Sequence, residues 1–364
     1  MDNSLQISDE LTLKRELKQI AVLGSFVVLG GFGVLQALNN GPSASQWLLQ
    51  TALLWAVVIA IACRKLQLNR LSENAALYPA LGWGNRLTLL RGALIAGCGG
   101  FLFADTNLSS NIWLPALFYS IAAVLDRIDG YVARRSQQVS LLGNELDISF
   151  DALGLVIAPV LAWNLGKIHG AYLLLSMAYY LYRWALQQRA QRGLPIYPIP
   201  TNPLRRSLAG FQMGFIALSL WPVLNPILTV VASIAFMLPV LFGFVVDWGV
   251  LSGWLKPQLL SQLTNASTNF FQPSLRLALL LLTATQLPIE PLYLLSVLMI
   301  TFGFAGRLGA ALLLLALGWQ TALTFTNISE YSLIFTASWL LLLGTGRYSI
   351  WRWGDDWVSR YDGA

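Results

Sequence analysis

Long apolar runs separated by short polar segments dominate the chain. A helix needs about 20 apolar residues to cross a bilayer, and somewhat fewer where neighbouring helices cover it. The runs are continuous and do not alternate with a period of two, so they predict helices and not the strands of a membrane barrel. The predicted spans lie near residues 20–38, 47–63, 87–104, 112–125, 148–165, 170–186, 208–222, 226–246, 274–287, 292–306, 308–326 and 331–345.

Composition agrees with this pattern. Hydrophobic residues make up 56% of the chain and charged residues 11%, against about 25% charged residues in a soluble domain. The mean hydropathy is +0.61. These values exclude a soluble globular protein, a disordered chain and a secreted disulfide scaffold. We therefore expect an all-α, polytopic membrane protein.

The basic residues predict the orientation of the chain. If the N-terminus is cytoplasmic and the spans alternate, 22 of the 23 Lys and Arg residues fall on the inner side and only Lys167 falls outside. A wrong number of spans would scramble this division. We expect both termini on the cytoplasmic side, in a bacterial inner membrane. The net charge of +6 reflects this bias, and we expect no nucleic-acid partner.

Acidic residues, which are costly in a bilayer, gather in one place. Asp126 and Asp129 are three residues apart, and Asp147 and Asp151 are four apart. On helices, each spacing places both carboxylates on one face. A hairpin with a flexible turn at Gly143 would bring the two faces together at the inner end of two helices.

Four clustered carboxylates repel one another, and a hard divalent cation (Mg²⁺, Mn²⁺ or Ca²⁺) would relieve the repulsion. Two such ions would bind a diphosphate. Gly130 and Ala133 leave room for a ligand close to the helix, and Arg134 is placed to neutralise phosphate. The structural alternative is that these acids cap helix ends and pair with Arg127, Arg134 and Arg135.

The acidic segment resembles a known signature. Residues 126–134 (DRIDGYVAR) and 143–151 (GNELDISFD) match all eight fixed positions of D-x2-D-G-x2-A-R…G-x3-D-x3-D, the pattern of the CDP-alcohol phosphatidyltransferases. Upstream, residues 85–91 (NRLTLLR) look like the family's N-x2-T-x2-R pattern. The resemblance covers about residues 80–247 and implies a six-helix core.

The resemblance implies a transferase of phospholipid biosynthesis. It would move a phosphatidyl group from CDP-diacylglycerol to a hydroxyl acceptor and release CMP, with two Mg²⁺ or Mn²⁺ ions as cofactors. Headgroup transfer from a soluble CDP-alcohol to diacylglycerol fits the same signature. The expected partners are the CDP-linked lipid or alcohol, the acceptor and membrane lipid, and a homodimer is left open.

The resemblance also implies roles for individual residues. The metal ligands would be Asp126, Asp129, Asp147 and Asp151, with Asp151 also the catalytic base. The nucleotide-binding residues would be Asn85, Thr88, Gly130, Ala133 and Arg134. The candidates for acceptor binding are Arg91, Arg183, Arg189, Arg205 and Arg206, which also fit as markers of the cytoplasmic side.

Four segments are predicted along the chain. Residues 1–79 would carry two transmembrane helices, 80–247 the catalytic core, 248–273 a polar linker and 274–364 a four-helix membrane domain that faintly resembles DoxX-like domains. Two other functional classes predict different patterns. A divalent-cation transporter would distribute its acids along a path at the midplane, and a catalytically silent scaffold would have lost a signature aspartate.

Overall fold

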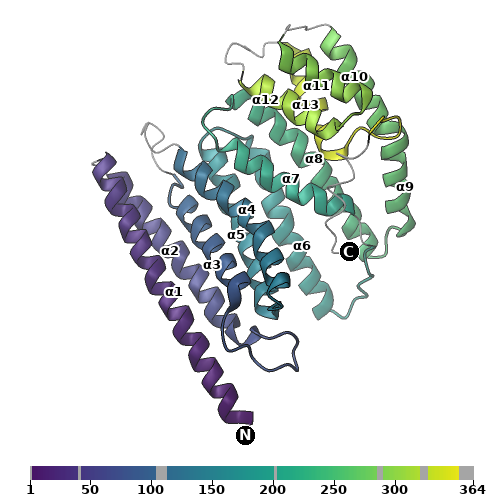
Figure 1. Cartoon of the computed structure of the whole chain (residues 1–364). Coiled ribbons are helices and arrows are strands. Elements are labelled where there is room, and N and C mark those ends of the chain that lie inside the picture. Colours follow the sequence, from purple (N-terminus) through teal and green to yellow (C-terminus); the bar gives the residue numbers. More distant parts are fainter. Residues whose placement is uncertain are drawn as a thin grey trace. The chain divides into compact units, whose positions relative to one another are not determined.

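The computed structural model describes residues 2–39, 42–103, 113–200, 203–284, 290–319 and 327–351. Within these ranges the chain is helical and contains no β-strand (Figure 1). The α-helices are α1 (Asp2–Asn39), α2 (Pro42–Lys65), α3 (Gly82–Gly99), α4 (Trp113–Arg135), α5 (Leu141–Asn164), α6 (Leu173–Gln191), α7 (Pro203–Ser219), α8 (Pro226–Leu251), α9 (Gln258–Ala266), α10 (Gln272–Ala284), α11 (Pro291–Phe302), α12 (Gly306–Trp319) and α13 (Ile328–Leu343). Short 3₁₀ segments η1 (Leu66–Leu68) and η2 (Gly170–Tyr172) and a π-helical turn η3 (Ser267–Phe271) accompany them.

Four helices are long and apolar enough to cross a membrane by their length and composition. They are Ser8–Leu38, Ala44–Leu68, Leu141–Asn164 and Pro226–Leu251. Helices α7, α11, α12 and α13 are apolar but shorter. Each predicted apolar run lies largely on a helix. The predicted class of an all-α, polytopic membrane protein is therefore confirmed, while the number and direction of the spans stay predictions.

One compact unit comprises Met1–Leu165 and Ile216–Pro222. Helix α3 is its central element, because α3 packs against α2, α4 and α5. A shared core includes Leu13 and Leu17 of α1, Val58 of α2, Leu89 of α3 and Phe150 of α5, all of them fully or almost fully buried. Helices α1 and α2 are thus built into the same core as the helices that carry the acidic motif.

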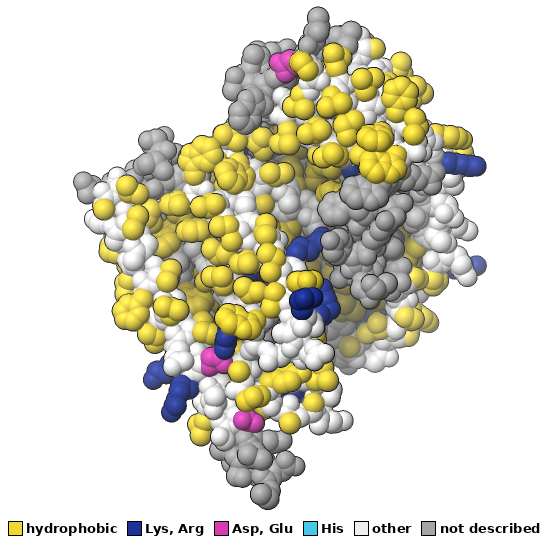
Figure 2. All heavy atoms as spheres, viewed as in Figure 1, with side chains coloured by type: hydrophobic (Ala, Val, Ile, Leu, Met, Phe, Trp, Pro, Cys, Tyr) yellow, Lys and Arg dark blue, Asp and Glu magenta, His cyan; other side chains and the backbone are white. Residues whose placement is uncertain are grey.

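Polar contacts collect at one end of this unit. Glu16 of α1 accepts hydrogen bonds from the backbone N–H of Leu81 (2.9 Å) and from Nε of Arg86 (2.8 Å). Lys65 at the end of α2 pairs with Glu145 of α5 at 2.6 Å. Over α1–α5, hydrophobic side chains dominate the face drawn in Figure 2, and charged side chains gather toward the end that holds the N-terminus of α1. The predicted inner helix ends therefore lie together.

The second compact unit comprises Gly166–Phe215 and Val223–Ala364. Nε1 of Trp339 on α13 donates to the carbonyl of Ala235 on α8 at 2.8 Å. Arg276 of α10 donates to the carbonyls of Ile300 (3.1 Å) and Thr301, at the end of α11. Helix α8 and the C-terminal helices thus form one packed body.

The segment predicted as a polar linker, 248–273, is largely helical. It contains the end of α8, all of α9 and the π-helical turn η3, which leads directly into α10. The physical reason is visible in α9, where Leu259, Leu260 and Leu263 recur at helical spacing among polar residues. A polar composition alone therefore did not reveal that this segment folds.

Candidate active site

The acidic motif is carried by the end of α4 and the beginning of α5. Ser140 caps α5, because its Oγ accepts a hydrogen bond from the backbone N–H of Gly143 at 3.0 Å. Gly143 was predicted as a flexible turn, and this is wrong, since it lies in the first turn of α5. A Cβ atom added to Gly143 would lie 2.6 Å from Oδ1 of Asn85. The glycine is therefore needed for the close approach of α3.

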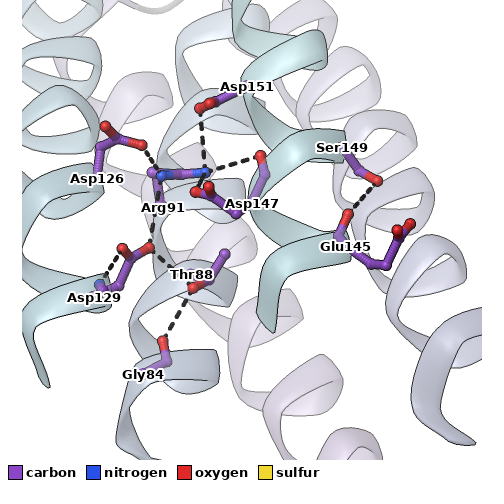
Figure 3. Close-up of polar contacts among 10 residues, drawn as sticks. Gly84, Thr88, Arg91, Asp126, Asp129, Glu145, Asp147, Ser149 and Asp151 are labelled. Atoms are coloured by element: carbon purple, nitrogen blue, oxygen red, sulfur yellow. Dashed lines mark hydrogen bonds and ion pairs between the residues drawn. The ribbon is translucent and has the colours of Figure 1, made fainter. Parts of the chain in front are cut away.

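The structure brings the motif carboxylates together. Asp126, Asp147 and Asp151 each offer one oxygen atom, and these atoms lie within 4.8 Å of one another. Figure 3 shows these side chains and Asp129 pointing toward Arg91, which comes from α3. The predicted meeting of the two acidic faces is thus present, and a third helix supplies a cation at its centre.

Arg91 is fully buried, with 0% of its side chain exposed. Its Nη1 pairs with Asp126 and lies 3.6 Å from Oδ2 of Asp129. Its Nη2 lies 2.8 Å from Oδ1 of Asp147 and 3.3 Å from Oδ1 of Asp151. The guanidinium group is thus surrounded by the carboxylates. Its role in binding the acceptor remains a prediction.

Thr88 orients one of the carboxylates. Its hydroxyl lies 2.9 Å from Oδ2 of Asp129 and 3.0 Å from the carbonyl of Gly84, one turn earlier on α3. A hydroxyl group that donates to a carboxylate favours one rotamer of that carboxylate. Thr88 therefore touches the proposed metal ligand directly, and its predicted contact with the nucleotide remains a prediction.

Asn85 is buried, and its amide ties three segments together. Its Nδ2 lies 3.0 Å from Oδ1 of Asn69, 2.7 Å from the carbonyl of Leu81 and 3.1 Å from Oγ of Ser140. Sequence reasoning missed the last partner, although a serine just before an apolar run is a helix N-cap signal. It also missed Asn69, for which the sequence holds no local signal. The predicted role of Asn85 toward the nucleotide remains untested.

Small residues set the approach of α3 to α4. A Cβ atom added to Gly84 would lie only 2.7 Å from Cβ of Ala133. Ala133 thus has a packing reason for its small size in addition to the predicted one. Gly130 has more space, since the nearest atom to an added Cβ is Nη1 of Arg134 at 3.4 Å. Arg134 is exposed at the end of α4.

The other candidate acceptor residues lie on later helices. Arg183 is exposed on α6. Arg189, also on α6, donates through Nη2 to the carbonyl of Ser252 at 3.1 Å. The backbones of Arg205 and Arg206 lie in α7, and their side chains lie outside the described part of the structure. Acceptor binding by these residues therefore stays a prediction.

The chemistry of the cluster fits divalent cations with oxygen ligands. Four carboxylates and one guanidinium leave three formal negative charges in a partly buried space. Oδ1 of Asp151 is buried and has no hydrogen-bond partner, although Arg91 lies within ion-pair distance. This carboxylate oxygen lies close to carboxylate oxygens of Asp126 and Asp147. Such a group of oxygen ligands suits Mg²⁺ or Mn²⁺.

Fold and site together define an integral-membrane protein with a carboxylate cluster suited to divalent cations. The model of one family, CDP-alcohol phosphatidyltransferase, matches residues 81–245. This segment belongs to that family, whose chemistry is the transfer of a substituted phosphate group in phospholipid synthesis and generally depends on a divalent cation. Neither a curated protein nor a solved structure matches the chain.

Proposed function

We propose that the protein transfers a phosphatidyl group from CDP-diacylglycerol to a hydroxyl acceptor and releases CMP. The observation that carries this proposal is the convergence of the motif carboxylates of α4 and α5 on one point. The family match supports the transfer of a substituted phosphate group. The long apolar helices of the chain support a donor that is itself a lipid.

Asp126, Asp129, Asp147 and Asp151 would hold Mg²⁺ or Mn²⁺. Such cations, when bound, supply positive charge that neutralises the diphosphate and the oxygen atom that leaves. Thr88 keeps Asp129 directed toward the cluster through its hydrogen bond of 2.9 Å. The exposed guanidinium of Arg134, at the same end of α4, would pair with phosphate oxygens of the donor.

In the proposed reaction, the hydroxyl oxygen of the acceptor bonds to the phosphorus that carries the diacylglycerol. The bond from this phosphorus to the bridging oxygen breaks, and CMP leaves with that oxygen. Asp151 takes the proton of the acceptor hydroxyl. Its Oδ1, which has no hydrogen-bond partner, has lone pairs available for this proton.

The first prediction concerns Asp151. We expect Asp151→Asn to lower CMP release about 100-fold or more, because the amide cannot take the proton and is a poor ligand for cations. The measurement is CMP release by the purified protein with CDP-diacylglycerol and Mn²⁺ or Mg²⁺. The acceptors to be compared are glycerol phosphate, inositol phosphate, inositol and serine.

Glu145→Gln is the matched control for this experiment. Glu145 lies on the same helix and pairs with Lys65 at 2.6 Å, and this variant should retain activity. Full activity of Asp151→Asn would contradict the proposed role. CMP release only from a soluble CDP-alcohol with diacylglycerol would favour headgroup transfer. No release from either donor, together with no binding of CDP, would favour a cation transporter.

A further inference from the structure

Arg91 contacts both helices of the acidic motif through different atoms. Nη1 faces α4, where it pairs with Asp126 and lies 3.6 Å from Asp129. Nη2 faces α5, where it lies 2.8 Å from Asp147 and 3.3 Å from Asp151. The two ends of one rigid, planar group therefore serve two helices, which the single nitrogen of a lysine could not do.

This bridge lies where the backbones of α4 and α5 have few close contacts. Helices α4 and α5 both pack closely against α3, which carries Arg91. The carboxylates on the two helices repel each other across this space. The guanidinium has no exposed surface, and the side chains of Asp126 and Asp129 are 24% and 7% exposed. Solvent therefore screens these two ion pairs less than those with Asp147 and Asp151, whose side chains are 45% and 44% exposed.

We propose that Arg91 is a positioning residue that holds the acidic ends of α4 and α5 together when no divalent cation is bound. Bound cations would take over much of this charge compensation. The inference rests on the proposed function in one respect, the choice of Mg²⁺ or Mn²⁺ as the bound cation. It assigns to Arg91 a task that binding of the acceptor would not require.

Linkage gives the proposal a measurable consequence. A group that stabilises the cation-free protein more than the cation-bound protein makes the stability less dependent on the cation. Replacing Arg91 with a neutral residue should therefore destabilise the protein mainly in the absence of the cation. A purely structural arginine would contribute equally in both conditions.

The test measures the thermal unfolding midpoint of the full chain in detergent, with EDTA and with saturating Mn²⁺. We expect Arg91→Met to lower the midpoint in EDTA by at least about 5 °C. In saturating Mn²⁺, the same substitution should lower the midpoint by less than half as much. Arg91→Lys keeps the charge without the two-ended reach, so its loss in EDTA should be intermediate.

Arg86→Met is the matched control on the same helix. Arg86 is partly exposed and pairs with Glu16 of α1, away from the cluster. Arg86→Met should therefore lower the unfolding midpoint equally in EDTA and in Mn²⁺. If the wild-type midpoint rises with Mn²⁺, equal lowering of the midpoint by Arg91→Met with and without Mn²⁺ would overturn the proposal. If Arg91→Met does not fold, the same comparison with Arg91→Lys decides.

Failure of the proposed function gives a different result. In that case the wild-type midpoint would not respond to Mn²⁺ and no CMP would be released. Arg91→Met would still lose far more stability than Arg86→Met, and the bridge would be supported without the cation site. If Arg91→Met lowers the midpoint no more than Arg86→Met does, the proposed bridge is overturned, whether or not the wild-type midpoint responds to Mn²⁺.

Discussion

Neutral side chains near the cluster are directed by specific hydrogen-bond partners. The hydroxyl of Thr88 lies 2.9 Å from Asp129, and the amide of Asn85 bonds to Asn69 and Ser140. Such partners fix the rotamers of the groups that would bind a ligand, which lowers the entropy that binding would otherwise lose. Neutral hydrogen-bonding side chains therefore matter to the site as much as the carboxylates do.

The second prediction concerns the hydroxyl of Thr88. Thr88→Val removes the hydroxyl at nearly constant volume, so Oδ2 of Asp129 loses this donor while Oδ1 keeps its hydrogen bond from the backbone N–H of Gly130. We expect the Mn²⁺ concentration for half-maximal CMP release to rise about 10-fold or more. Thr88→Ser, which keeps the hydroxyl, should stay close to wild type. Identical Mn²⁺ dependence of the valine and serine variants would contradict this role of the hydrogen bond.

At the scale of helices, α3 determines how the motif is assembled. It packs against α2, α4 and α5, and Gly84 lets it approach Ala133 of α4 closely. The acidic motif is continuous in sequence through α4 and α5, yet its two halves are held in place by a helix that precedes both. The residues upstream of the motif thus belong to the site through packing as well as through chemistry.

Gly84→Ala tests this close approach. An added Cβ would lie 2.7 Å from Cβ of Ala133, so we expect a loss of about 1–3 kcal/mol in the free energy of unfolding. Gly30→Ala on α1 is the control, because no atom lies within 4 Å of its added Cβ. Chemical denaturation in detergent measures both variants. A Gly84→Ala protein as stable as the control would show that α3 and α4 can separate without cost.

At the scale of the whole molecule, the family segment and the compact units differ in extent. The matched residues 81–245 begin in the first unit and end in the second, which also holds the C-terminal helices. The packing of Trp339 against α8 explains why the contacts group α8 with those helices. The domain limits at 80–247 and 274–364 remain our proposal for how the chain is divided by function.

The orientation in the membrane gives a prediction at this scale. In a background without Cys63 and Cys98, we expect His169→Cys to react with a membrane-impermeant maleimide in intact spheroplasts. Arg135→Cys should react only after permeabilisation, because the turn after α4 is predicted to be cytoplasmic. Both side chains are exposed in the structure, so access is comparable. The reverse pattern would invert the predicted topology.

The sequence by itself determined the class of the fold and the chemistry of the acidic motif. Continuous apolar runs predict helices because hydropathy and helical spacing are local properties of the chain. The spacings of Asp126 with Asp129 and of Asp147 with Asp151 fixed which carboxylates share a face. The eight matched positions of the signature identified the family, and the family match confirmed it.

Only the tertiary structure decided how separate helices meet. The sequence predicts Arg91 as a candidate for acceptor binding or a marker of the cytoplasmic side. Its place among four carboxylates follows from the packing of α3 against both α4 and α5. The same holds for Gly143, whose absent side chain makes room for Asn85 of another helix. Contacts between residues distant in sequence depend on which helix faces pack together, and no local pattern encodes that choice.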